Sequence, residues 1–358
     1  MLPAIQACLP EEIAETHGLA VGEVRSMVAS IQQRGQSLGL VSSRISRRTS
    51  QCLSESYRIG TLTIAGEANS SLDPFAKYLT RAEDGALIET VRIPLEKQGC
   101  FSVCVSSQVG CGLGCRFCKT AQLGLLRNLE AWEIVEQVRL VRANLPPQGR
   151  ITGVVFQGMG EPLANLEAVV QAIRVLSHPC GQSVDQKAMT VCTAGLPGPI
   201  RRLTQARLRI RIALSVGSAR PSKRGELMPI DARFPLSQTV DAIIEHALIT
   251  HQAPMLSYTL IHDVNTSPED AQALRELALH IGASCGRMPR VSLIPYNSQG
   301  PGDVFRRASE AEAEEFRLVL ADAGFPVVRR YSGGRDINAG CGQLAAMSKW
   351  SEAESTSC

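Results

Sequence analysis

The sequence has no long apolar run, because no window of its 358 residues approaches the roughly 18 uninterrupted apolar residues of a membrane span. The stretch after Met1 also lacks the basic start, apolar run and small-residue cleavage site of a secretory signal. Its 12 cysteines therefore do not predict the disulfide framework of an exported protein. We expect no membrane partner, a reducing cytoplasmic location, and cysteines that bind a cluster or take part in catalysis.

Internal repeats, low-complexity blocks and a large net charge are also missing. The net charge is +3, with 44% apolar and 20% charged residues, which is typical of a soluble globular protein and does not by itself indicate a nucleic-acid binder. The basic residues nevertheless form short clusters, which would bind phosphates if several shared one face but which equally suit solvated helix faces. These clusters are Arg44, Arg47 and Arg48; Arg201, Arg202, Arg207, Arg209 and Arg211; Arg287 and Arg290; Arg306 and Arg307; and Arg329, Arg330 and Arg335.

Three cysteines, Cys111, Cys115 and Cys118, form a C-x3-C-x2-C motif with no fourth cysteine nearby. Three thiolates can hold three irons of a [4Fe-4S] cluster and leave the fourth iron open to another ligand. Glycines at 110, 112 and 114 suit a tight loop whose backbone N–H groups face a negatively charged cluster. A zinc site, which normally has a fourth Cys or His, and a chance grouping of buried thiols are the alternatives.

Beyond residue 100, apolar β-rich runs alternate with amphipathic helical patterns, which is typical of βα units around a parallel sheet. About six such units predict an α/β fold with a complete or partial barrel. The expected strands are 101–106, 151–156, 188–192, 209–215, 255–261, 291–294 and 327–330, and the expected helices are 130–143, 165–177, 236–250, 268–281 and 309–323.

The region 1–95 has a different pattern and is expected to be an N-terminal accessory region. Two helices are expected to begin at Pro10 and Val21, and the second presents an apolar face at positions 24, 27, 28 and 31. Runs at 78–80 and 87–93 flank Asp84-Gly85 and predict a hairpin. We expect residues 96–347 to be the catalytic domain and 348–358 a flexible tail, with loops at 146–147, 197–199 and 300–302.

Residues that could take part in catalysis or binding lie where the expected strands end. Parallel barrels carry their active sites at the carboxyl ends of strands. The segments concerned are 111–118, 158–162, 193–195, 215–217, 295–297 and 333–341. An open iron can chelate the amino and carboxylate groups of S-adenosylmethionine. Gly160 permits close backbone approach and Glu161 can accept from an ammonium group, although a turn before Pro162 also explains both residues.

Four motifs resemble the radical S-adenosylmethionine RNA methyltransferases of the RlmN/Cfr family. They are the cluster loop with residues 104–111 before it, Gly158-Met159-Gly160-Glu161-Pro162-Leu163, Leu293-Ile294-Pro295-Tyr296-Asn297, and the stretch from Arg335 to Leu344 that ends in Ala-Gly-Cys-Gly-Gln-Leu. The match runs from about residue 75 to 347. The resemblance implies a partial (β/α)6-type barrel of the radical SAM class, with a small N-terminal helical and β-hairpin accessory domain. It also implies that the region 1–95 contacts RNA.

The resemblance further implies methylation of an adenine ring carbon, with C2 favoured, in rRNA or tRNA. Cys341 would take a methyl group from one S-adenosylmethionine, and a second molecule cleaved at the single [4Fe-4S] cluster would supply the radical that activates it. Glu89 matches the proton acceptor, and Cys104 matches the thiol that releases the product by forming a transient disulfide with Cys341. From the residues alone, Cys104 suits a buried strand position, Glu89 an exposed strand carboxylate and Cys341 an exposed loop.

The residues that align with cofactor contacts of the family are Gly160, Glu161, Cys192, Ser215, Val216, Gly217 and Asn297. Family members commonly have serine near Cys192 and Ser-Leu-His in place of Ser215-Val216-Gly217, so side-chain hydrogen bonds at 192 and 217 are in question. The implied partners are an RNA substrate with an unstacked adenosine, an electron donor such as a flavodoxin-type reductase system, and a thiol reductant. We expect a monomer.

Other functions stay open at this point. Within the class, methylation at C8 or of a non-RNA acceptor is the alternative. Outside it, the cluster motif also suits a non-methylating iron-sulfur radical activase or electron-transfer protein, or an RNA-binding zinc protein without catalysis. The pair Cys104 and Cys341 favours methylation, because neither electron transfer nor hydrogen abstraction from a partner needs these two thiols.

Overall fold

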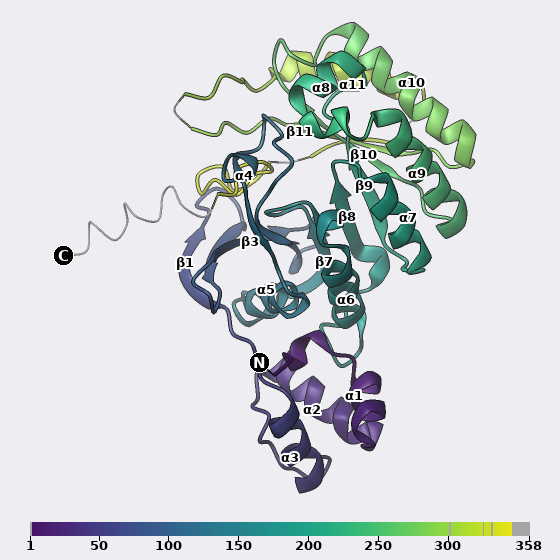
Figure 1. Cartoon of the computed structure of the whole chain (residues 1–358). Helices are drawn as coiled ribbons and strands as arrows, with labels where there is room; N and C mark the ends of the chain where they lie inside the picture. The colour runs from purple at the N-terminus through teal and green to yellow at the C-terminus, as the bar shows by residue number, and fades with distance from the viewer. Residues whose placement is uncertain (1, 301, 325, 331, 346–358) are drawn as a thin grey trace, which may run out of the picture.

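The computed structural model describes residues 2–300, 302–324, 326–330 and 332–345, so the expected tail at 348–358 lies outside the described residues. One ten-stranded sheet has the order β1-β2-β3-β4-β7-β8-β9-β10-β11-β12 (Figure 1). Its strands are β1 Thr63–Asn69, β2 Ala76–Arg81, β3 Leu87–Pro94, β4 Cys100–Val105, β7 Arg150–Phe156, β8 Met189–Thr193, β9 Arg211–Ser215, β10 Met255–Leu260, β11 Arg290–Pro295 and β12 Val327–Arg329.

The sheet is antiparallel from β1 to β4 and parallel from β4 to β12. All seven strands expected beyond residue 100 are present, within one or two residues of their ends. Because the strand order is open among the described residues, the sheet is a partial barrel, as predicted. A separate pair, β5 Gln108–Gly110 and β6 Leu125–Asn128, was not anticipated because each strand is too short to show a pattern.

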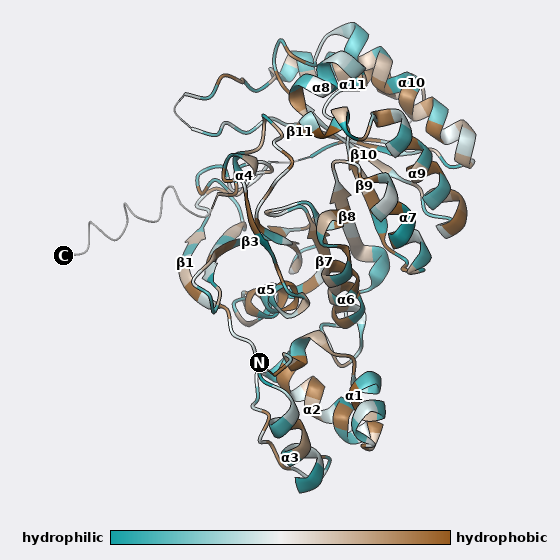
Figure 2. Ribbon diagram, viewed as in Figure 1, coloured by the Kyte–Doolittle hydropathy of each residue, from teal (hydrophilic) through white to brown (hydrophobic). Residues whose placement is uncertain are grey.

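Helices cover the outer face of the parallel strands (Figure 1). They are α5 Ala131–Ala143, α6 Leu166–Ser177, α7 Pro197–Gln205, α9 Leu236–Thr250, α10 Pro268–Cys285 and α11 Glu310–Ala321. Two short helices, α4 Lys119–Gln122 and α8 Pro221–Leu227, follow the cluster loop and β9. Apolar side chains of α5, α6, α7, α9, α10 and α11 form one core with the strands. Figure 2 shows this distribution, with apolar residues concentrated on strands such as β3 and β7 and on the helices beside them.

A loop was expected at 197–199, and this expectation is wrong. Pro197 is the first residue of α7. Proline is well suited to that position because its fixed φ is helical and the N–H it lacks would have no partner inside the helix. The proline therefore starts a helix here instead of interrupting the chain.

The N-terminal helices α1 Pro10–His17, α2 Val21–Arg34 and α3 Arg47–Ser56 pack around their own apolar cluster, which includes the expected face of α2 at Val24, Met27, Val28 and Ile31. They lie apart from the sheet in Figure 1. By contrast, β1 to β3 hydrogen-bond into the main sheet through the β3–β4 pair. A boundary at 95/96 therefore runs between two paired strands of one sheet. No helix among the described residues is long and apolar enough to cross a membrane.

Candidate active site

The cluster loop lies between β5 and β6 at the carboxyl end of β4. Cys111, Cys115 and Cys118 all line a cavity of about 500 Å³ inside the barrel. Gly110 has φ +77°, and a Cβ there would lie 1.9 Å from the carbonyl oxygen of Gly124, so only glycine allows the two strands to meet. The backbone N–H of Cys111 donates to that same oxygen at 2.8 Å.

The three thiols of the cluster loop share one cavity, and the backbone N–H of Cys118 donates to the carbonyl oxygen of Cys115 at 3.1 Å. Three thiolates without a fourth protein ligand suit a [4Fe-4S] cluster with one open iron. Burial raises the pKa of Cys111 to about 11 and also raises the pKa of Cys115, so both thiols need a metal to ionise at neutral pH.

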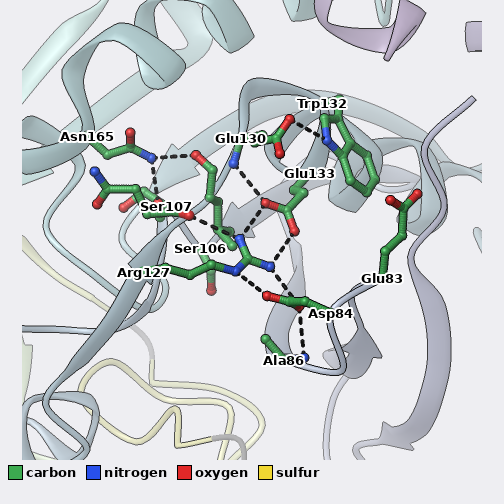
Figure 3. Close-up of polar contacts among 12 residues, drawn as sticks. Glu83, Asp84, Ala86, Ser106, Ser107, Arg127, Glu130, Trp132, Glu133 and Asn165 are labelled. Atoms are coloured by element: carbon green, nitrogen blue, oxygen red, sulfur yellow. Dashed lines mark hydrogen bonds and ion pairs between the residues drawn. The ribbon is translucent and has the colours of Figure 1, made fainter. Parts of the chain in front are cut away.

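Arg127 anchors the β5–β6 pair to the rest of the fold (Figure 3). Its guanidinium contacts Asp84 in the β2–β3 turn through Nε at 2.5 Å and Glu133 of α5 through Nη1 at 2.8 Å. Glu133 also accepts from the N–H of Glu130 at 2.8 Å. Next to it, the amide of Asn165 donates to the carbonyl oxygen of Ser107 at 2.8 Å. The strand pair that flanks the cysteine loop is thus tied to the β2–β3 turn, to α5 and, through Ser107, to Asn165.

The loop after β7 approaches the cluster loop through two glycines. A Cβ at Gly158 would lie 2.7 Å from the backbone of Val105, and one at Gly160, where φ is +97°, would lie 2.5 Å from the Gln108 side chain. Gln108 accepts from the N–H of Glu161 at 2.8 Å. Close packing therefore requires glycine at both positions, as the motif suggested for Gly160.

Glu161 is buried at the base of the cavity. One carboxylate oxygen accepts from the N–H of Leu163 at 3.0 Å and the other from the N–H of Ala194 at 2.9 Å. Burial raises the pKa of Glu161 to about 7, against the lowering effect of these hydrogen bonds. The carboxylate links the ends of β7 and β8 and lines the cavity, where it can face an ammonium group.

The ends of β8 and β9 bring Cys192, Ser215 and Gly217 to the cavity, and Val216 is fully buried beside them. At Gly217 a Cβ would lie 2.5 Å from the sulfur of Met228, and φ is +67°. Met228 therefore fills the space that a larger side chain at position 217 would need. This gives a physical reason why the chain has glycine where the family pattern has a larger residue. Cys192 is buried, and burial raises its pKa to about 12.

Sequence reasoning missed Arg224, which organises these strand ends. It is fully buried, and its guanidinium donates to the carbonyl oxygens of Ala194, Ser215 and Val216 while pairing with Asp231. The only feature of the local sequence that points to this role is the position of Arg224 in α8, the helix that follows β9. Three backbone acceptors from two loops are a tertiary feature that no spacing in the sequence indicates.

Cys341 lies beside the cluster loop, although more than 200 positions separate them in sequence. The backbone N–H of Lys119 donates to the carbonyl oxygen of Gly342 at 2.8 Å, and the hydroxyl of Thr120 donates to that of Leu344 at 2.6 Å. Figure 1 shows this C-terminal segment, in yellow, beside α4. Cys341 is half-buried and lines the cavity, so the expectation of an exposed loop cysteine is wrong.

Asn297 holds the Cys341 loop in place. Its amide nitrogen donates to the carbonyl oxygen of Cys341 at 3.2 Å, and its oxygen accepts from the hydroxyl of Ser332 at 2.7 Å. The sequence suggested only a cofactor contact at this residue. The structure gives it a role in shaping the loop as well.

Cys104 and Glu89 lie on the inner face of the sheet. Cys104 on β4 is buried yet lines the cavity, so burial and access to Cys341 are compatible. Glu89 on β3 is 1% exposed, which corrects the expectation of an exposed carboxylate. Its Oε1 pairs with Lys77 at 3.0 Å, and its Oε2 has no hydrogen-bond partner among the described residues. Glu89 does not itself line the cavity.

Several basic clusters that suggested a phosphate-binding surface are neutralised by carboxylates. Arg201 pairs with Glu245, and Arg202 with Glu167. Likewise, Arg306 contacts Asp263 and Arg329 contacts Glu310. In the last cluster Arg330 points inward to the cavity, so it does not belong to a surface patch.

No family model matches the chain. It is 48% identical over 356 residues to a protein of Sorangium cellulosum named "Probable RNA methyltransferase", covering 94% of this chain and 91% of that one. It is 42% identical to the dual-specificity RNA methyltransferase RlmN of Syntrophobacter fumaroxidans, covering 76% of this chain and 77% of that one.

Among solved structures, a radical SAM methyltransferase from Sphaerobacter thermophilus superposes with a TM-score of 0.85 at 31% identity, covering 96% of this chain and 99% of that one. Radical SAM enzymes use a [4Fe-4S] cluster and S-adenosylmethionine, and the cysteine motif for such a cluster is present here. The chain therefore belongs to the RlmN-type family of radical S-adenosylmethionine RNA methyltransferases.

Proposed function

We propose that this RNA methyltransferase methylates an adenine ring carbon, with C2 favoured over C8, through an S-methyl group carried on Cys341. The observation that carries the proposal is the meeting of Cys341 and Cys104 in the cavity that the three cluster cysteines line. A ring carbon of adenine is a poor nucleophile, so a methyl carrier on the protein and a radical are needed in place of direct transfer. Two thiols outside the cluster motif suit a carrier and a releasing group.

Most of the residues that would hold the cofactors line the same cavity, and Val216 and Asn297 lie next to lining residues in sequence. Cys111, Cys115 and Cys118 would bind three irons, and Gly160 with Glu161 would receive the methionine end of S-adenosylmethionine. Further contacts are assigned to Cys192, Ser215, Val216, Gly217 and Asn297. When bound, the cluster and S-adenosylmethionine together would supply the radical that activates the methyl group.

The remaining steps belong to the side chains. Glu89 is proposed as the proton acceptor, because its Oε2 is a buried acceptor without a hydrogen-bond partner among the described residues. Lys77, at 3.0 Å from Oε1, would hold the carboxylate in a fixed orientation. Cys104 would then attack the sulfur of Cys341 and release the methylated RNA, and an external thiol reductant would reopen the disulfide. The electron donor and the monomeric state stay predictions.

The proposal is tested on anaerobically reconstituted protein by mass spectrometry of Cys341 and by mapping the modified nucleotide in RNA. We expect an S-methyl group on Cys341, no product from Cys341→Ala, and an RNA–protein adduct that accumulates with Cys104→Ala. Cys52→Ala, a change on α3 away from the cavity, is the matched control and should keep full activity. RNA methylation at an unchanged yield by Cys341→Ala would disprove the carrier role, and a product methylated at C8 would correct the position.

A further inference from the structure

Arg330 is a half-buried basic residue that the proposed reaction does not yet use. It follows β12 directly, and its backbone N–H donates to the carbonyl oxygen of Leu293 at 2.9 Å. Its side chain turns into the cavity, where Nη1 donates to the Oε1 of Gln157 at 2.9 Å. The guanidinium is thus held at a fixed place at the inner end of the last strand.

Thiols from three other parts of the fold line the same cavity as Arg330. Besides Cys341 and the three cluster cysteines, the titratable or charged groups that line this cavity are Glu96, Cys104, Glu161, Cys192, Tyr296 and Arg330. Arg330 is the one cation among these lining residues. Arg330 and Cys341 line this cavity together.

The electrostatic effects of these groups agree with their positions. Burial alone would lower the pKa of Arg330, but the neighbouring groups, Cys341 first and then Cys192 and Cys104, raise it overall. In return, burial raises the pKa of Cys104 and of Cys192, while Arg330 lowers both. Glu161 acts on the pKa of Cys192 in the opposite direction to Arg330.

We propose that Arg330 is a positioning residue whose guanidinium holds first Cys341 and then Cys104 as the reacting thiolate. The inference rests on the proposed methyl-carrier function. Arginine suits the task because it stays charged when buried and because its planar group can serve two sulfur atoms in turn. Gln157 fixes the orientation of the guanidinium by accepting a hydrogen bond from it.

Both thiol steps balance in atoms and electrons, and Arg330 is the one cation that they use. In the first, Cys341 has lost its proton to solvent, its sulfur forms a bond to the sulfonium methyl carbon, and the old carbon–sulfur bond leaves its electron pair on the departing thioether. In the second, Cys104 forms a bond to the sulfur of Cys341. The bond from that sulfur to the RNA-linked carbon breaks, its electron pair stays on the carbon, and the carbon takes a proton. A dithiol reductant later supplies two electrons to reopen the disulfide.

The test measures thiol reactivity without RNA or S-adenosylmethionine. Full-length, anaerobically reconstituted protein with unmethylated Cys341 is treated with iodoacetamide between pH 6 and 10, and alkylation of each cysteine is followed by mass spectrometry. For Arg330→Gln we expect alkylation of Cys341 at neutral pH to slow about tenfold, since losing one pKa unit of thiolate stabilisation lowers the thiolate fraction tenfold. Arg330→Lys should restore most of the rate.

Two further variants make the result specific. Arg329→Gln removes the neighbouring, outward-facing arginine that pairs with Glu310 and should leave the alkylation profile of Cys341 unchanged. Gln157→Leu keeps the charge of Arg330 but removes its anchor, and it should give an intermediate shift even if Arg330→Gln does not fold. An unchanged pH profile in the folded variants would overturn the proposal. If the shift appears but no methyl is found on Cys341, the thiolate role stands and the proposed function fails.

Discussion

At the scale of single residues, close packing at the cavity is set by positions where a side chain has no room. Gly160 has a φ of +97°, and a Cβ at this position would lie only 2.5 Å from the side chain of Gln108. Gln108 in turn binds the N–H of Glu161. Displacing Gln108 would therefore move the carboxylate that is proposed to receive S-adenosylmethionine.

Gly160→Ala should lower the free energy of unfolding by about 2–3 kcal/mol, because it adds both backbone strain and overpacking. It should also weaken binding of S-adenosylmethionine at least tenfold, measured by isothermal titration to the reconstituted protein. Gly225→Ala is the control, since its Cβ would meet nothing within 4 Å and its change lies in α8. Equal cofactor affinity in Gly160→Ala would contradict the role of this glycine.

Glu161 gives a pH dependence with a definite sign. Its pKa is raised from 4.5 to about 7, so between these values the folded protein keeps a proton that the unfolded chain has lost. The free energy of unfolding of the cluster-free protein should therefore fall by up to ~3 kcal/mol from pH 4.5 to above pH 7. Glu161→Gln should remove most of that slope in urea titrations at several pH values, and the same slope in both proteins would show that other groups cause it.

At the scale of elements, the short β5–β6 pair depends on contacts with distant elements. It carries the cluster loop, yet its own strands span only Gln108–Gly110 and Leu125–Asn128. A two-stranded pair of this length is not stable alone. Arg127, bound to Asp84 and to the buried Glu133, supplies the missing constraint (Figure 3).

Arg127→Met should destabilise the protein by about 2 kcal/mol, because Glu133 stays buried without its charged partner, while the partial exposure of Arg127 limits the loss. The iron content after reconstitution should fall as well, since the cluster loop loses its anchor. Arg25→Met breaks the exposed pair with Glu11 and should cost less than about 1 kcal/mol, with full iron content. Chemical denaturation and iron analysis together decide whether Arg127 matters for the loop.

At the scale of the whole molecule, a buried glutamine network joins the N-terminal helices to the sheet region. Gln6 donates to the carbonyl oxygen of Gly60 at 2.6 Å and accepts from its N–H at 3.0 Å. Gln182 donates to the carbonyl oxygen of Gln32 at 2.9 Å. These bonds place the exposed arginines of the α3 region, Arg44, Arg47 and Arg48, on a unit attached to the barrel.

If this N-terminal unit contacts RNA, changing Arg44, Arg47 and Arg48 together to glutamine should weaken RNA binding. The slope of log affinity against log salt should become shallower by about 0.7 for each phosphate of single-stranded RNA that the variant no longer neutralises. Filter binding at several salt concentrations measures both. Arg201→Gln with Arg202→Gln is the control, because both side chains already pair with carboxylates. An unchanged slope in the triple variant would remove this unit from the RNA surface.

The parallel strands, most of the helices and the cysteine loop are predictable from the sequence, because they depend on local spacing: apolar periodicity, glycines at tight turns and three thiols within eight positions. The sequence also placed the motifs at strand ends, from which a shared rim follows. The wrong predictions came from local patterns considered without their tertiary contacts. At Pro197, for example, a proline that was predicted to lie in a loop begins a helix.

Which charged side chains face inward depends on tertiary contacts and is not visible in the sequence. Arg224 and Arg330 look like surface arginines in sequence, and Glu89 looks like a solvated carboxylate, yet all three are enclosed by the barrel or its rim. Burial depends on what covers a residue from distant parts of the chain, which no local pattern encodes. The approach of Cys341 to the cluster loop has the same origin, since a backbone hydrogen bond from Lys119 and a side-chain bond from Thr120 hold a segment more than 200 positions away.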